Sequence, residues 1–175
     1  MKFKGIYLVA SLMFFQFCSE NRERKVSEAE LRETEKALVG ANRILVKKDR
    51  EKIMAYIRRN NLTMKETPTG LWYGIERHGF GVKSQPGALV TLKYKVSLLD
   101  GTVCYDSDSL GVKQFRLGKG GVESGLEEGI LLLRVGDKAT FIMPPHLAHG
   151  LQGDGDRIPA RSIIMYDVLL LKVEP

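Results

Sequence analysis

The segment from Val90 to Gly101 constrains the fold most, because its side chains alternate strictly between apolar and polar. Apolar side chains occupy every second position, namely Val90, Leu92, Tyr94, Val96 and Leu98. The pair Asp100-Gly101 follows as a two-residue hairpin signal. A period of two is that of a strand with one buried face, so the sequence predicts a half-buried antiparallel strand here.

Other segments after Pro68 extend this pattern. "LWYGI" and "KATFIM" read as short strands, and "IIMYDVLLLKV" places Ile164, Tyr166, Val168 and Leu170 on one side. One short helix is expected in "GLEEGILLL", where Leu126, Ile130 and Leu133 share a face. These elements predict an α+β fold, an antiparallel sheet curled around one short helix.

A helical arm is expected before the sheet. Ser27 and Glu30 form a capping box, and apolar residues then recur at spacings of three and four from Leu31 to Leu45. A second helical run, "DREKIMAYIRR", begins at Asp49, a good N-cap residue. The apolar face of this arm packs either on the main domain or on a second copy in a homodimer.

The amino terminus has the layout of a secretory signal. Two lysines precede an apolar run from Gly5 to Phe17, and Cys18 and a polar segment follow. The run is too short to span a bilayer comfortably. Cys18 stands where a bacterial lipoprotein carries its lipid, although Phe15, Gln16 and Phe17 depart from the usual lipobox, so an uncleaved anchor and simple cleavage remain alternatives. We expect export to the periplasm with a lipid anchor in the outer membrane.

Composition excludes several classes of protein. The chain of 175 residues is 43% apolar and 27% charged, as in a soluble globular domain. Its net charge of +6 is spread among alternating acids and bases, so no nucleic-acid partner is expected. With Cys18 lipidated, Cys104 has no disulfide partner and is expected to be a small buried side chain.

Two of the three histidines lie in the segment "PPHLAHG". His146 and His149 are too few ligands for a zinc site, and His78 would have to arrive from a distant turn. No P-loop or cysteine-rich metal motif is present, and "GKGG" reads as a tight turn. We therefore expect no metal and no cofactor.

Five segments together resemble one protein family. They are "VTLKYKVSLLDG", "YDSD", "FRLGKGGVESGLEEGI", "VGDKATFIMPPHLAHG" and "IPARSIIMYDVLLLKVEP". In this order they are similar to the FK506-binding-protein (FKBP) class of peptidyl-prolyl cis–trans isomerases over about residues 70 to 175. The resemblance implies an FKBP-like domain at 67–175, a tether and helical arm at 18–66 and a signal peptide at 1–17.

The resemblance also implies the roles of individual residues. Catalytic roles fall to Tyr105, Asp106, His149 and Tyr166, and substrate-binding roles to Tyr94, Phe115, Val122, Glu123, Leu126 and Ile158. Three positions depart from the family pattern. Leu126 stands where tryptophan is common, Glu123 replaces isoleucine but keeps the backbone N–H that the family uses, and His149 replaces a tyrosine whose hydroxyl holds the peptide.

The function implied is isomerisation of X–Pro bonds in unfolded or nascent exported polypeptides, within an apolar pocket that also binds macrolide inhibitors. The alternative is a holdase chaperone that keeps the pocket only to bind peptides, and the three departures keep this alternative open. Signal, cysteine and helical arm together are similar to the exported isomerase lipoproteins of the Bacteroidetes, including those associated with gliding motility.

Overall fold

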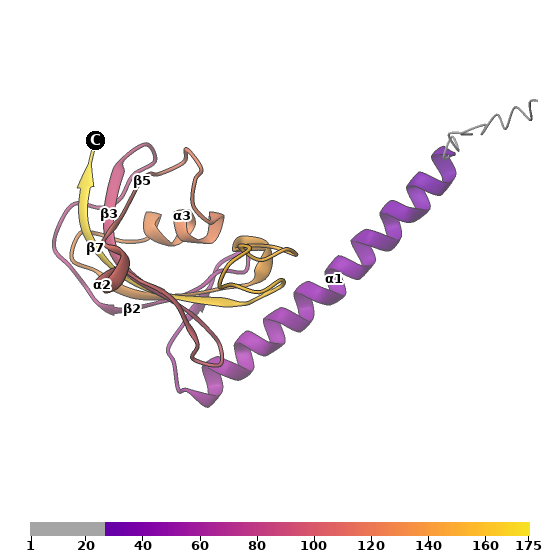
Figure 1. Ribbon diagram of the computed structural model, residues 1–175, viewed down its shortest axis with the longest axis horizontal. Helices are drawn as coiled ribbons and strands as arrows, with labels where there is room; N and C mark the ends of the chain where they lie inside the picture. The colour runs from indigo at the N-terminus through magenta and orange to yellow at the C-terminus, as the bar shows by residue number, and fades with distance from the viewer. Residues whose placement is uncertain (1–26) are drawn as a thin grey trace, which may run out of the picture. The chain divides into compact units, whose positions relative to one another are not determined.

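The computed structural model describes residues 27–175, so the expected signal peptide and Cys18 lie outside the described residues. The helices and strands along the chain are as follows (Figure 1): α1 Glu28–Arg59, β1 Lys65–Glu66, β2 Trp72–Arg77, β3 Leu89–Leu98, β4 Val103–Asp106, α2 Ser107–Leu110, β5 Lys113–Arg116, α3 Ser124–Leu131, β6 Lys138–Met143, the 3-10 turn η1 Pro145–Leu147, and β7 Ile164–Glu174.

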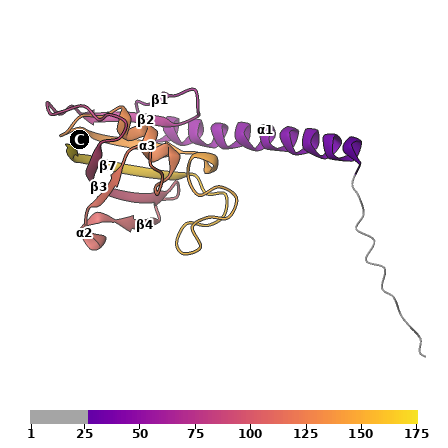
Figure 2. The same cartoon turned by 90° about the horizontal axis from the view of Figure 1, so that it is seen from above.

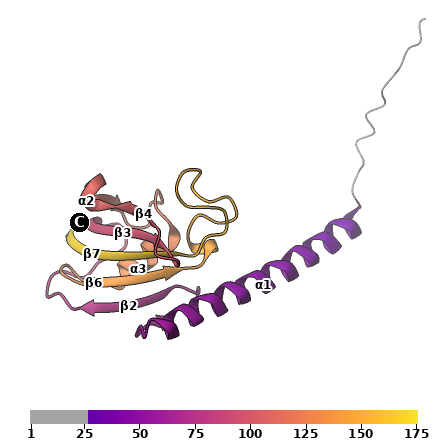
Figure 3. The same ribbon diagram turned by 60° about the horizontal axis from the view of Figure 1, so that its bottom comes forward.

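All the strands join one antiparallel sheet. Its order is β1-β2-β6-β7-β3-β4, with β5 paired to β3 beside this path. Strands β2, β6, β7, β3 and β4 lie side by side in Figure 3. The longest ladder joins β3 to β7, from Leu89 opposite Glu174 to Leu98 opposite Ile164. The α+β fold predicted from the sequence is therefore confirmed, with α3 inside the curve of the sheet (Figure 1).

The alternating strands bury the faces that the sequence predicts. Val90, Leu92 and Val96 of β3 are at most 1% exposed. The apolar side of β7, namely Ile164, Tyr166, Val168 and Leu170, is at most 2% exposed. The period of two continues across a bulge between Thr91 and Leu92 in the pairing with β7. Burial of these side chains is what holds the sheet in this register.

Helix α3 lies very close to the sheet because a glycine faces it. A Cβ atom on Gly129 would stand 2.7 Å from the ring of Phe141 in β6. The predicted apolar face of this segment is fully buried, with Leu126, Ile130 and Leu133 at 0% exposure. The predicted buried cysteine is also confirmed, since Cys104 is a free thiol with 2% exposure.

The chain divides into two compact units, residues 1–37 and 38–175. The described part of the first unit is the start of α1. The capping box is confirmed there, because Glu30 N–H donates to Ser27 Oγ at 3.2 Å and Ser27 N–H donates to Glu30 Oε2 at 2.9 Å.

The expectation of two helical runs is wrong, because α1 continues through Asp49 without a break. Asp49 does not cap a helix; its carboxylate is buried in an ion pair with Arg161. In the second unit, Ile53 is 0% exposed and packs with Ile142 and Ile163, so this part of α1 packs on the sheet domain. Leu38 stays exposed, at 66%. Among residues 27–175, no helix is long and apolar enough to cross a membrane.

Candidate active site

Most of the residues singled out in the sequence meet at one hydrophobic cluster. Phe115, Leu126, Ile158 and Tyr166 belong to the buried core, and Tyr94, Tyr105 and Val122 pack against it while staying partly exposed. They come from β3, β4, β5, β7, the entry to α3 and the long connection after η1. This connection forms a wide loop in Figure 2. The antiparallel sheet therefore brings together residues that are distant in the sequence.

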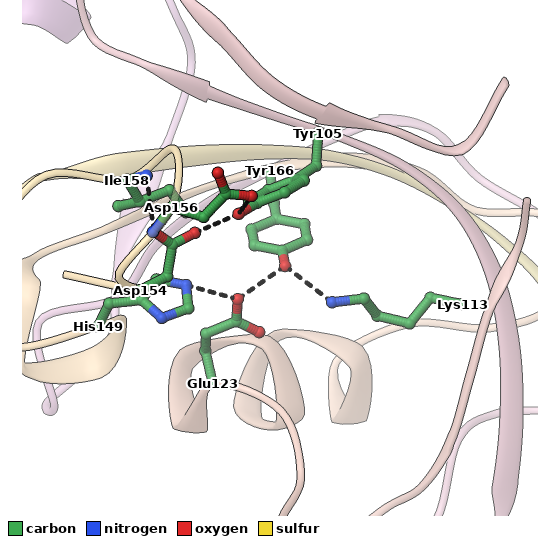
Figure 4. A network of polar contacts seen from close by, with 8 residues as sticks. All are labelled: Tyr105, Lys113, Glu123, His149, Asp154, Asp156, Ile158 and Tyr166. Carbon is green, nitrogen blue, oxygen red and sulfur yellow. Dashed lines mark hydrogen bonds and ion pairs between the residues drawn. The ribbon is translucent and has the colours of Figure 1, made fainter. Parts of the chain in front are cut away.

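A polar network crosses this cluster (Figure 4). Tyr166 donates its hydroxyl to Glu123 Oε1 at 2.8 Å, and His149 Nε2 lies 3.1 Å from the same oxygen. The imidazole is not aligned for a hydrogen bond, so the contact between His149 and Glu123 is electrostatic. Glu123 Oε2 is buried and has no hydrogen-bond partner among the described residues.

The inward side chain of Glu123 corrects the expectation for this residue. The resemblance implied that mainly its backbone N–H would serve the site, yet the side chain is 8% exposed and points into the cluster. The physical reason is the hydroxyl of Tyr166, a residue only 1% exposed. A buried tyrosine hydroxyl needs a polar partner, and Glu123 supplies one. The expected apolar pocket therefore contains a carboxylate.

Lys113 is a site residue that the sequence reasoning missed. Its ammonium group donates to the Tyr166 hydroxyl at 3.2 Å and lies over the rings of Tyr94 and Tyr166, at 5.0 and 5.6 Å from their centroids. A cation over an aromatic face is attracted by the negative face of the ring. A signal was present in the sequence, because Lys113 lies two residues before Phe115 and therefore shares its face of β5.

The hydroxyl of Tyr166 is held in its neutral form. Burial raises its pKa, and the negative charge of Glu123 and the hydrogen bond to it raise the pKa further. The hydroxyl therefore donates a hydrogen bond to the carboxylate and accepts one from the ammonium group of Lys113. Three elements, β5, β7 and the segment before α3, are joined by this one hydroxyl.

Tyr105 links β4 to the long connection after η1, on a second side of the site. Its hydroxyl donates to Asp154 in the long connection, and this hydrogen bond, followed by burial, raises the pKa of Tyr105 to about 12. Arg157 lies over the Tyr105 ring, 5.4 Å from its centroid. Asp154 Oδ1 accepts from the backbone N–H of Asp156 at 2.9 Å and of Ile158 at 2.8 Å.

The pKa of Asp154 reflects these contacts. Burial raises it, but the hydrogen bonds from Tyr105 and from two backbone N–H groups outweigh burial and lower the pKa to about 2. The sequence reasoning did not select Asp154, although "GDGDR" is a pattern in which Asp side chains bond nearby backbone N–H groups.

Asp106 and His146 are not brought into the network. The Asp106 side chain accepts from Asp108 N–H at 2.8 Å and thereby caps α2. His146 is exposed, and its Nε2 lies 3.0 Å from the carbonyl oxygen of Thr69. Within residues 27–175, no three His, Cys, Asp or Glu side chains stand close enough together to hold a metal ion.

A hollow of about 400 Å³ lies beside the network. It is lined by Lys113, Gly121, Val122, Glu123, Ala148 and His149. Glu123 precedes the first turn of α3, and its backbone N–H has no hydrogen-bond partner among the described residues. The arrangement offers apolar walls, one free N–H donor and ionisable groups to a small ligand.

Comparison with known proteins links this geometry to one family. Residues 81–171 match the family model described as FKBP-type peptidyl-prolyl cis-trans isomerase. The chain is 33% identical over 159 residues to a probable FKBP-type peptidyl-prolyl cis-trans isomerase, FkpA, of Neisseria meningitidis, covering 89% of this chain and 57% of the relative. It is 38% identical over 112 residues to FkpA of Aeromonas hydrophila, covering 63% of this chain and 41% of the relative. The chain thus spans about half the length of these curated relatives.

Solved structures are similar as well. The crystal structure of FkpA from Escherichia coli matches with a TM-score of 0.62 and 30% identity, over 86% of this chain and 75% of that one. The crystal structure of AtFKBP13 matches with a TM-score of 0.61 and 30% identity, over 63% of this chain and 98% of that one. The second match covers nearly the whole of a smaller protein.

Proposed function

The chain belongs to the FKBP-type peptidyl-prolyl cis–trans isomerase family, and we propose that it accelerates the isomerisation of X–Pro bonds in exported polypeptides. The observation that carries this proposal is the meeting of Tyr94, Phe115, Leu126 and Tyr166 from separate elements in one cluster beside an open hollow. Such a cluster suits a prolyl ring, which is apolar and brings no N–H donor.

The reaction needs no covalent step. Rotation about an X–Pro bond crosses a barrier of about 18–20 kcal/mol because the twisted amide loses its resonance. A site that takes the prolyl ring out of water and holds the carbonyl favours the twisted, less polar amide over the planar one. A thousandfold acceleration requires only about 4 kcal/mol of such preference.

Each part of the site has a proposed role in this reaction. Leu126 forms the floor under the prolyl ring, and the aromatic rings form its walls together with Val122 and Ile158. The free backbone N–H of Glu123 holds a carbonyl of the peptide. His149, which lines the hollow, and Tyr105, which packs against the cluster, contact the peptide, and Asp106 acts by shaping the turn that follows Tyr105.

The polar network favours the second candidate function, a peptide-binding holdase with little turnover. Glu123 is hydrogen-bonded to Tyr166 and lies beside His149, so an incoming prolyl ring must displace a buried carboxylate. This displacement slows catalysis without removing the apolar surface that binds peptides. The isomerase remains the principal proposal because Tyr94, Phe115, Leu126 and Tyr166 meet in one cluster beside the hollow.

A protease-coupled isomerisation assay on several X–Pro peptides tests the proposal. We expect the chain to accelerate the slow phase in proportion to its concentration. Val122→Arg should abolish the acceleration by filling the hollow, whereas Val112→Arg, at a position that is 50% exposed and does not line the hollow, should not. Rates equal to the uncatalysed reaction for every peptide would favour the holdase, which suppression of aggregation of an unfolded client would then test.

The proposed place of action is the periplasm, with Cys18 carrying a lipid that anchors the chain to the outer membrane. The support is the apolar run from Gly5 to Phe17 that ends at Cys18. Mass spectrometry of the mature protein tests this proposal. We expect a lipidated N-terminal cysteine that is absent in Cys18→Ser, and an unmodified N-terminus would contradict it.

We further propose that α1 pairs with a second copy of the chain. Its exposed apolar side chains include Leu38 and Ile44, which are 66% and 59% exposed. Light scattering during gel filtration should give a dimer for the native chain and a monomer for the variant Leu38→Glu/Ile44→Glu. We also propose that macrolides inhibit the isomerase. We propose further that the chain is related to the gliding-associated lipoproteins of the Bacteroidetes.

A further inference from the structure

A buried ion pair joins helix α1 to the long connection of the site. Asp49 is only 4% exposed, and its Oδ2 lies 2.7 Å from Arg161 Nη2. Aspartate is rarely buried in this way unless it is paired. The neighbouring residue Arg50 makes a different contact, a two-pronged ion pair with Glu66 of β1 that is much more exposed. The two pairs start from adjacent residues of one helix but reach different parts of the domain.

Arg161 lies near the end of this connection, where its backbone joins that of Gly150. Its backbone has a φ of +57°, a left-handed conformation that side chains other than glycine adopt rarely. Its N–H donates to the carbonyl of Gly150 at 3.1 Å, so the segment from Gly150 to Arg161 is a closed loop. An uncommon backbone conformation persists only where the surroundings hold it, and the ion pair with Asp49 is such a contact.

The loop that Arg161 closes carries several parts of the site. Ile158 lies three residues before Arg161 and is buried in the hydrophobic cluster, at 3% exposure. His149 directly precedes Gly150, the residue that Arg161 holds. At the far end of the loop, Asp154 is fastened to Tyr105 and to the N–H of Ile158. The loop is therefore held at its far end by Tyr105 of the site and at its base by Asp49 of α1.

We propose that Asp49 is a positioning residue of the active site, acting through Arg161 on the loop from Gly150 to Arg161. It holds the base of this loop so that His149 lines the hollow and Ile158 stays in the hydrophobic cluster beside it. Helix α1 is thus a support of the site as well as an arm. This inference rests on the proposed isomerase function for its kinetic consequence, but its structural consequence can be measured separately.

The test compares Asp49→Asn with Glu66→Gln in the full chain. Asp49→Asn keeps the shape of the side chain and removes its charge, while Glu66→Gln does the same to the ion pair of Arg50. We expect Asp49→Asn to lower kcat/KM by about 5- to 20-fold, because small displacements of positioning groups are costly in catalysis. We expect Glu66→Gln to remain within about twofold of the native value, as exposed ion pairs contribute little.

Amide hydrogen exchange provides the second readout. Asp49→Asn should accelerate exchange in residues 150–161 by at least about tenfold, while the amides of β3 and β7 keep their protection. Glu66→Gln should leave the loop unchanged. Equal exchange of the loop in both variants would overturn the inference, whatever the kinetics show. A native chain without isomerase activity would instead contradict the proposed function and leave the exchange result to decide this inference.

Variants of Arg161 test the same ion pair in case Asp49→Asn fails to fold. The side chain of Arg161 is 30% exposed, so substitution there disturbs the core less. Arg161→Gln should reproduce the loss of Asp49→Asn, and Arg161→Lys, which keeps the charge, should recover most of the activity. The double variant Asp49→Asn/Arg161→Gln should be no worse than either single variant, because the two residues act as one unit. Additive losses would overturn the proposal.

Discussion

The hydroxyl of Tyr166 donates a 2.8 Å hydrogen bond to the carboxylate of Glu123, a residue 43 positions away in the sequence. This bond places a buried charge in a cluster that otherwise consists of aromatic and aliphatic side chains. The carboxylate also stands 3.1 Å from His149 Nε2. Under the proposed function, these contacts close the cluster to a prolyl ring, which has to break them in order to bind.

Replacing Glu123 by isoleucine removes this closure. We expect the KM for a leucyl-prolyl peptide to fall by about 3- to 10-fold, because a hydrogen bond to the carboxylate no longer competes with the peptide and is worth about 1 kcal/mol. The protease-coupled assay over a range of peptide concentrations measures this change. Tyr166→Phe, which removes only the hydroxyl, should shift KM in the same direction by a smaller factor. An unchanged or raised KM in both variants would contradict the closure.

Gly129 should tolerate no side chain. A Cβ atom there would lie 2.7 Å from the Phe141 ring, so Gly129→Ala forces α3 away from β6. We expect a loss of about 1–3 kcal/mol in the free energy of unfolding, measured by urea titration. Gly40→Ala in α1 is the matched control, because nothing lies within 4 Å of its Cβ position. It should be neutral or stabilising by up to about 1 kcal/mol, since alanine favours a helix over glycine. Equal effects at the two positions would argue against the close packing of α3.

Asp154 should contribute to stability in a defined pH range. Its pKa is lowered from 3.8 to about 2 in the folded chain, so the folded state favours the charged form. Such a group stabilises the fold above the pKa of the unfolded chain, and this contribution disappears as the pH falls through the folded pKa. Urea unfolding of the native chain and Asp154→Asn should therefore differ most above about pH 4.

The difference between the two proteins should shrink steadily towards pH 2. Comparison with Asp154→Asn removes the contribution of all other carboxylates, because both proteins share them. A difference that stays constant from pH 5 to pH 2 would show that Asp154 is not held in its charged form by Tyr105 and the backbone N–H groups.

The amino-acid sequence by itself determined the class of fold and the family. The alternation in β3 and β7 and the spacing of Leu126, Ile130 and Leu133 are properties of neighbouring residues, so they predict strands and a helix without knowledge of the rest of the chain. The apolar site residues of the cluster were instead assigned through the resemblance of five short segments, in their order, to the FKBP class. The resemblance of these segments to the FKBP class is confirmed by the family match.

Only the tertiary structure decided which polar side chains enter the site. Lys113 reaches Tyr166 across 53 residues, and Arg161 reaches Asp49 across 112. Asp49 satisfies the local rule for a helix cap, yet it lies inside a continuous helix, and its carboxylate pairs with a distant guanidinium group. The direction of the Glu123 side chain likewise depends on a hydroxyl group in another strand. Local periodicity decides where the backbone goes, whereas a buried charge is stable only beside partners that the completed fold supplies.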